Sequence, residues 1–394
     1  MAFFLGISHY LVITFAKIRI TQITNRAVLT SLKTKLKLTD DQAVLMAKHA
    51  GIARFTFNWG LGIWTALCKD GFKPNAFALK KFFNNHLKPV YPWIRQKGIC
   101  QKVTQYAFEH LGKAFKNFYE GRASYPKFKK KGRHDSFTID ASGRPIAIGG
   151  TRLKLPTIGW VSTYEGLPHV KTKAFTISRE AGSWYISFTS EIELEVTPKS
   201  RDFVGVDLGV KELATLSSGL VIANPKALRK AREQLARLQR QLQHKEKGSN
   251  RYNRQKLRLA KAHQRIKHIR RDATHKATTY ICKNHAVVAI EDLNVSGMMA
   301  NHKLAGAIAD ANFYEFRRQI EYKAQRYGSF VVLVERWYPS TQLCSICSEK
   351  QPMSLSDRLY ECSSCGFRAD RDFNASVNLE NYARMAKPSL GTEG

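Results

Sequence analysis

Acidic residues are scarce in this chain of 394 residues, where 31 Asp and Glu stand against 64 Lys and Arg and give a formal net charge of +33. Such an excess of one sign repels itself unless a polyanion neutralises it. Hydrophobic residues make up 43% of the chain and charged residues only 24%, which excludes a disordered basic tail. The length is typical of about two or three domains. We therefore predict a folded, multi-domain protein whose partner is nucleic acid, rather than an anionic membrane or the ribosome.

Long hydrophobic runs are also missing from the sequence. A membrane-spanning helix needs roughly 20 apolar residues, and the apolar run at residues 2–16 is shorter and contains His9. Its basic neighbours Lys17 and Arg19 follow the run, whereas a signal peptide has such residues before it. We expect a soluble protein with no membrane partner. Residues 1–28 are expected to be an N-terminal extension: an extra strand, a disordered leader, or the product of a start codon placed too far upstream.

Cysteine is rare, and four of the seven cysteines fall into two C-x-x-C pairs near the C-terminus, 14 residues apart. Two such pairs supply four thiolates for a tetrahedral zinc ion. Disulfides or redox chemistry are the alternative, which a cytosolic chain disfavours. Four thiolates leave no open coordination position, so we predict one structural zinc ion, in a module spanning residues 340–368. The predicted ligands are Cys344, Cys347, Cys362 and Cys365.

The first half of the chain combines strand and helix patterns. Residues 27–38 alternate loosely like a strand, and Thr39 followed by Gln42 predicts a capping box at a helix start. Apolar residues then recur at helical spacing within residues 42–120. Short alternating runs at 136–198 predict antiparallel strands of a small barrel or sandwich.

Basic residues concentrate in two segments. Residues 226–271 carry 17 Lys and Arg but only two acids, and they predict an antiparallel pair of long helices. The expected apolar seam consists of Leu228, Leu235, Leu238, Leu242, Leu257, Ile266 and Ile269. A merely solvated helix face normally carries both signs of charge, so we predict polyanion binding. The second segment is the loop at 121–135, where phosphate contact and a solvated loop are equally supported. The predicted nucleic-acid contacts are Lys127, Lys129, Lys130, Lys131, Arg229, Arg237, Arg240, Arg251, Arg254, Arg258 and Arg265.

Three acids occupy unusual positions in the mixed α/β region that begins near residue 202. Asp207 interrupts an apolar strand, Glu291 ends another, and Asp372 lies at the start of a C-terminal helix. A carboxylate at the end of a buried strand is costly unless it is paired or metal-bound. A shared cluster holding two Mg²⁺ ions would suit phosphodiester hydrolysis. Helix caps and surface ion pairs are the alternative, and spacing alone does not decide between them.

Several motifs occur in an order that closely resembles the TnpB family of transposon-encoded RNA-guided nucleases. They are GVDLGV at 205–210, IEDLN at 290–294, the paired cysteines, and DRDFNA at 370–375. The loop at 125–132 and the segment 33–42 are similar as well, so the resemblance covers about residues 30–380. It implies a multi-domain α+β protein with a β-barrel wedge domain, a helical recognition insertion, and an RNase H-like RuvC domain. The corresponding ranges are 29–41 with 121–200, 42–120, and 201–394.

The resemblance also implies roles for the three acids and for the basic surfaces. Asp207, Glu291 and Asp372 match the metal-binding catalytic acids of a Mg²⁺-dependent endodeoxyribonuclease, with Asp370 as the rival to Asp372. The implied partners are a guide RNA from the transposon end and double-stranded target DNA, cut beside a short adjacent motif. We expect a monomer in the ribonucleoprotein, in the prokaryotic cytosol. A strand-joining transposase and a nuclease-inactive DNA-binding regulator are the alternatives, and the intact acids argue against the regulator.

Overall fold

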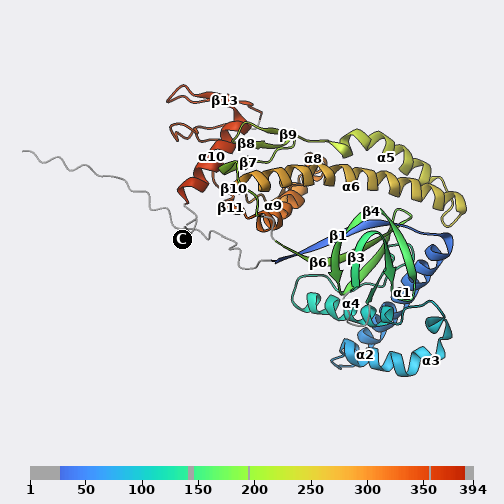
Figure 1. Ribbon diagram of the computed structural model, residues 1–394. Helices are drawn as coiled ribbons and strands as arrows, with labels where there is room; N and C mark the ends of the chain where they lie inside the picture. The colour runs from blue at the N-terminus through green and yellow to red at the C-terminus, as the bar shows by residue number, and fades with distance from the viewer. Residues whose placement is uncertain (1–26, 141–145, 194–195, 355, 387–394) are drawn as a thin grey trace, which may run out of the picture. The chain divides into compact units, whose positions relative to one another are not determined.

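The computed structural model describes residues 27–140, 146–193, 196–354 and 356–386. It divides the chain into two compact units, of which the first comprises residues 27–192 and the second begins at residue 193 (Figure 1). The predicted extension at 1–28 falls outside the described residues except for its last two, which begin the first strand. Within the described residues, no helix is long and apolar enough to cross a membrane.

The first unit contains a helical lobe whose start is set by local sequence. Thr39 caps the longest helix of this unit: its Oγ1 accepts the Gln42 N–H at 3.3 Å, and the Gln42 Oε1 accepts the Thr39 N–H at 3.1 Å. The predicted capping box is therefore confirmed. The helices are α1 Asp40–Lys69, α2 Ala76–Phe82, the π-helical turn η1 Phe83–Leu87, α3 Lys88–Val90, the 3₁₀ turn η2 Pro92–Arg95 and α4 Lys102–Tyr119.

A six-stranded sheet completes the first unit, in the order β2-β5-β6-β1-β4-β3. The strands are β1 Ala27–Lys37, β2 Ser136–Asp140, β3 Ile146–Leu155, β4 Gly159–Thr172, β5 Ala174–Glu180 and β6 Ser183–Glu193. Helices and sheet share one hydrophobic core, to which α1 contributes residues such as Met46 and β6 contributes residues such as Phe188. Within it Trp64 stacks on Phe115 with ring centroids 4.2 Å apart, so this tryptophan is a core residue.

The second unit is built on a five-stranded mixed sheet in the order β11-β10-β7-β8-β9. The strands β7, β10 and β11 run parallel, while β8 pairs antiparallel with β7 and β9. The sheet strands are β7 Arg201–Asp207, β8 Glu212–Leu216, β9 Val221–Ala223, β10 His285–Glu291 and β11 Phe330–Val334; a separate small hairpin pairs β12 Leu359–Glu361 with β13 Arg368–Asp370. The helices are α5 Ala227–Gln243, α6 Asn250–Asn284, α7 Val295–Ala300, α8 Ala305–Ala311, α9 Phe313–Tyr327 and α10 Arg371–Met385.

Helices cover both faces of this sheet. Val204 and Val206 pack with apolar residues of α6 and α9 on one face, and Leu379 of α10 packs with Val287 on the other. The close approach of α10 depends on Gly205, because a Cβ there would lie 1.8 Å from the Ser376 carbonyl oxygen. Alternation of side chains along β7 then directs Asp207, two residues beyond Gly205, to the same face as α10.

The basic helical pair differs from the prediction in two respects. It extends beyond residue 271, since α6 continues to Asn284. Its seam also differs, because Leu257 and Ile269 are exposed, whereas Leu259 and Ala262 pack with Leu235, Ile266 and their neighbours. The heptad-like spacing therefore selected the wrong face of α6 at those two positions.

Candidate functional site

Two of the predicted acids end neighbouring parallel strands. Asp207 is the last residue of β7 and Glu291 the last of β10. The register pairs Ile290 with Val206, so the next residues along, Glu291 and Asp207, lie side by side at the carboxyl edge of the sheet. Adjacent strands are about 4.8 Å apart. Both acids also share a face: Val206 and Ile290 point into the core with α6 and α9, so the residues that follow them point toward α10.

The third predicted acid lies in the first turn of α10. Asp370 is the N-cap of this helix, and its Oδ1 accepts the N–H groups of Asp372 at 2.9 Å and Phe373 at 3.2 Å. Arg371 donates to Asp372 Oδ1 from Nε at 3.1 Å and from Nη2 at 2.9 Å. Asp370 is therefore engaged in capping the helix, whereas Asp372 is held by a forked contact to its neighbour.

Burial dominates the electrostatics of the acid pair. Asp207 is 9% exposed, and burial raises its pKa well above the usual range, reinforced by the charges of Glu291 and Asp372 and opposed by that of Arg371. Burial also raises the pKa of Glu291, while the hydrogen bond from Ser340 lowers it. Among the described residues, none donates a hydrogen bond to the Asp207 carboxylate or forms an ion pair with it.

This donor set fits a divalent cation such as Mg²⁺. Carboxylate oxygens are the ligands that Mg²⁺ prefers, and an unpaired buried carboxylate such as that of Asp207 is costly unless a cation compensates it. The three acids do not form a closed ligand cluster: among the described residues, only the four cysteines bring their ligand atoms within 4.8 Å of one another. The acids influence one another electrostatically and lie at one edge of the sheet, with Asp372 on the helix that covers it.

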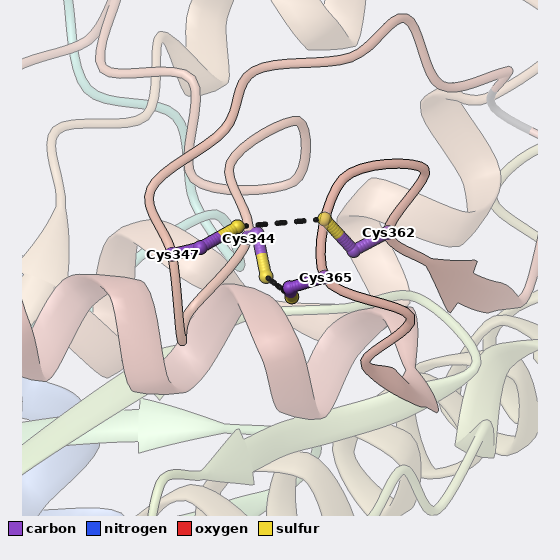
Figure 2. A group of neighbouring side chains, drawn as sticks. All are labelled: Cys344, Cys347, Cys362 and Cys365. Atoms are coloured by element: carbon purple, nitrogen blue, oxygen red, sulfur yellow. Dashed lines mark hydrogen bonds between the residues drawn. The ribbon is translucent and has the colours of Figure 1, made fainter.

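The four predicted zinc ligands converge at one point (Figure 2). The Cys344 and Cys365 sulfurs are 3.6 Å apart, and those of Cys347 and Cys362 are 3.5 Å apart. A disulfide requires about 2.05 Å, whereas tetrahedral thiolates about 2.3 Å from zinc lie about 3.8 Å from one another. The sulfur spacing therefore fits four thiolates around one metal ion and does not fit disulfides.

The two cysteine pairs adopt the same backbone turn. In the first, the Ser348 N–H donates to the Cys344 carbonyl at 2.9 Å; in the second, the Gly366 N–H donates to the Cys362 carbonyl at 3.0 Å. The residue after each second cysteine has a positive φ, +63° at Ser348 and +73° at Gly366. Glycine suits this left-handed conformation, while serine is strained in it. The matched turns explain how both pairs direct their sulfurs to a common centre.

Replacing Ser348 with glycine is therefore expected to stabilise the cysteine module by about 0.5–1 kcal/mol, because the left-handed penalty of an L-residue exceeds the entropic cost of glycine. Gly366→Ala should have the opposite effect, through backbone strain alone, since a Cβ there meets no atom within 4 Å. The rate of zinc release to a chelator measures both effects. Release is expected to be slower than in the wild type for Ser348→Gly and several-fold faster for Gly366→Ala. The control is Ser364→Gly, an exposed position with an ordinary φ. Slower release from Gly366→Ala would contradict the argument.

The predicted nucleic-acid contacts separate into two groups. All seven arginines on the helical pair are exposed, and none forms an ion pair with another described residue. In the loop, Lys127, Lys130 and Lys131 are exposed as well. Lys129 differs: its Nζ lies over the Phe57 ring, 4.1 Å from the centroid, and burial lowers its pKa. This lysine contributes to packing of the first unit, and the other ten basic side chains face solvent.

Sequence reasoning missed several residues around the acids. Ser340 donates to Glu291 Oε1 at 2.6 Å, and a groove of about 530 Å³ beside Glu291 is lined by Arg317, Arg318 and Arg336. Only Arg371, which donates to Asp372, carried a local signal, because it stands within the DRDFNA motif. Ser340 is 49 positions from its partner, and no periodicity links the two.

Comparison with known proteins identifies the family. The chain is 34% identical over 371 residues to "Putative RNA-guided DNA endonuclease InsQ" of Escherichia coli K12, covering 89% of this chain and 91% of that protein. The chain belongs to the TnpB family. A second TnpB-type relative, "Putative RNA-guided DNA endonuclease" of Streptomyces pristinaespiralis, is 31% identical over 358 residues and covers 86% of each chain.

Family descriptions match three parts of this TnpB-family chain. Residues 185–302 match "Probable transposase", 313–379 match "Cas12f1-like, TNB domain", and 28–71 match "Helix-turn-helix domain". The last description differs from the structure, since residues 28–71 form strand β1 and the single continuous helix α1. The fold is similar to that of Cas12f1 in a complex with sgRNA and target DNA, with a TM-score of 0.55 and 11% identity over 91% of this chain and 99% of that one.

Proposed function

We propose that this TnpB-family protein is an RNA-guided DNA endonuclease that hydrolyses target DNA at the site of Asp207, Glu291 and Asp372. The observation that carries the proposal is the buried, unpaired carboxylate of Asp207 beside Glu291, on the sheet face covered by the helix of Asp372. The relatives named as RNA-guided DNA endonucleases support it, since they align over most of this chain. Acids ending parallel strands of a mixed sheet also support assigning the second unit to the RuvC type.

The chemistry proposed for the site is metal-assisted phosphodiester hydrolysis. Bound Mg²⁺, in a pair of ions, would activate a water molecule and stabilise the charge on the leaving oxygen. Asp207, Glu291 and Asp372 would hold those ions, and Arg371 orients the Asp372 carboxylate through its two hydrogen bonds. Three arginines line the groove beside Glu291 and would guide the phosphates of the strand toward these acids by exchanging their present carboxylate partners for phosphate.

The same proposal assigns the remaining parts of the chain. The four cysteines hold one structural zinc ion, and the first unit supplies a β-barrel wedge with a helical recognition insertion. The exposed arginines of α5 and α6 bind the backbone of a guide RNA or its hybrid with DNA, where base pairing reads the sequence. The guide comes from the transposon end, and the protein acts as a monomer in the cytosol of a prokaryotic cell.

Two measurements on one preparation test the proposed function. Sequencing the RNA that copurifies with the protein is expected to give a single abundant species that spans a transposon end. Reconstituted with that RNA, the protein should cut matching duplex DNA with Mg²⁺ and leave unmatched duplex intact. Joined DNA strands in place of cut ends would favour the transposase alternative. Guide-dependent DNA binding without cutting would favour the inactive regulator.

Removal of three arginines from α6 is expected to weaken RNA binding mainly through charge. Arg251, Arg254 and Arg258 are exposed and fall on successive turns of the helix. Each lost phosphate contact lowers the slope of log affinity against log salt by about 0.7–0.9. The triple Ala variant should therefore lose up to about 2–3 units of slope in a binding titration over several salt concentrations. The triple Lys variant keeps the charge and should keep the slope; an unchanged slope in the Ala variant would place the RNA elsewhere.

A further inference from the structure

Buried asparagines join α10 to the backbone of the first cysteine pair. Asn374 is fully buried, and its Nδ2 donates to the Leu343 carbonyl at 2.7 Å, while its Oδ1 accepts the Ser345 N–H at 3.0 Å. Leu343 and Ser345 are the two neighbours of Cys344. Both sides of one proposed zinc ligand are therefore hydrogen-bonded to the helix that carries Asp372.

Asn378 extends this contact toward the acids. It lies four residues after Asn374 and so on the same face of α10. It is 3% exposed, and its Nδ2 donates to the Leu343 carbonyl at 2.7 Å and to the Ser340 carbonyl at 2.8 Å. Ser340 is also 3% exposed, and its Oγ donates to Glu291 Oε1 at 2.6 Å. Hydrogen bonds thus run continuously from Glu291 to the backbone around Cys344.

The geometry has a direct consequence for the acids. A glutamate side chain has several rotatable bonds, so an ordered Glu291 carboxylate needs a fixed partner. Ser340 supplies that partner through one oxygen and leaves the other available to a cation. Because the Ser340 carbonyl is held by Asn378, the partner is fixed relative to α10 and therefore relative to Asp372. Without these amide donors the buried carbonyls would lack hydrogen bonds, which costs free energy. This cost disfavours any rearrangement that breaks the contacts.

We propose that Ser340, Asn374 and Asn378 form a positioning bridge through which the cysteine module fixes Glu291 relative to Asp372. The inference rests on the proposed role of the acids and goes beyond it, because these three residues are assigned neither to zinc nor to catalysis. Metal-ligating carboxylates are commonly oriented by hydrogen bonds from outside the ligand set, and loss of such a bond typically costs 10–100-fold in metal affinity. In this protein, the hydrogen-bond support of Glu291 would depend on the folded zinc module.

Binding of Mn²⁺ to the zinc-loaded full chain, free of RNA, tests the bridge without requiring cleavage. Mn²⁺ binding is followed by EPR titration. The signal that remains in the Asp207→Asn variant is subtracted, so that the difference reports the acid site alone. Ser340→Ala should weaken Mn²⁺ binding about tenfold, whereas Ser340→Thr keeps the hydroxyl and should bind close to wild type. Ser363→Ala, an exposed serine in the same module, is the matched control. Wild-type Mn²⁺ affinity in Ser340→Ala would overturn the proposal.

Asn378→Ala tests the coupling between the two sites. It should release zinc to a chelator several-fold faster and also weaken Mn²⁺ binding several-fold, although Asn378 belongs to neither ligand set. Asn253→Ala, which removes an exposed amide on α6, should change neither. Faster zinc release with unchanged Mn²⁺ affinity would show that the module is not coupled to the acids. A wild-type protein that binds Mn²⁺ in this way but cuts no guided target would refute the proposed function and leave the bridge standing.

Discussion

Asp207→Asn is expected to slow Mg²⁺-dependent cutting of guided target DNA by about a thousandfold, while guide and target binding stay close to wild type. The substitution keeps the shape of the side chain and removes the charge that a divalent cation requires. Loss of a contribution of several kcal/mol to the transition state corresponds to about three decades in rate. Single-turnover cleavage of a preformed complex measures the rate, and a gel-shift titration measures the binding. The matched control is Asp202→Asn, which changes an exposed acid on the same strand.

The same variant should be more stable than wild type when Mg²⁺ is absent. Burial raises the pKa of Asp207 in the folded protein above its value in the unfolded chain. The folded state therefore binds more protons between those two pKa values, and stability falls as pH rises through that window. The cost of the buried charge grows as the pH rises from the unfolded pKa to the raised folded pKa, so the gain from Asp207→Asn should disappear near pH 4 and increase steadily toward neutral pH. Cutting by Asp207→Asn at the wild-type rate would refute the catalytic assignment. A variant less stable than wild type at neutral pH would contradict the electrostatic argument.

Local signals predicted some elements well because their partners are close in sequence. The capping box at Thr39 involves two residues three positions apart, and helix α1 begins where that pattern places it. The end of α6 was missed because its last turns leave the basic pattern. There Ala277, Ile281 and Cys282 are buried in the core shared with α9. Tertiary packing, and not charge, sustains the helix to Asn284.

In the candidate site, too, features set by local sequence could be predicted, and features set by tertiary contacts could not. Asp207 and Glu291 could be singled out because each interrupts or ends an apolar strand. The cysteines could be grouped because each pair is local and the chemistry needs four of them. The support around the acids could not be predicted from periodicity, since Asn378 bonds with a carbonyl 38 positions away and Ser340 with a carboxylate 49 positions away. These contacts exist only once β10, the cysteine module and α10 are assembled.

Cys344→Ser is expected to reduce the bound zinc from one equivalent to nearly none and to unfold the module around it. Cys344 is completely buried, and its sulfur lies 3.6 Å from that of Cys365. A structural zinc ion contributes roughly 10–16 kcal/mol to the folding of small zinc-finger peptides, and a serine hydroxyl is a poor replacement for a thiolate. Mass spectrometry of the native protein measures the stoichiometry. Cys68→Ser, at an exposed cysteine outside the module, should keep its zinc.

The damage should spread beyond the cysteines, because Cys344 lies between two backbone groups that bond with α10. Loss of the turn would free the Leu343 carbonyl and the Ser345 N–H from Asn374. Limited proteolysis is therefore expected to cut Cys344→Ser within residues 340–370 under conditions that leave the Cys68→Ser control intact. Exposed segments with little remaining structure are the preferred sites of such cleavage. One equivalent of zinc still firmly bound to Cys344→Ser would count against four-cysteine ligation, because three thiolates would then suffice.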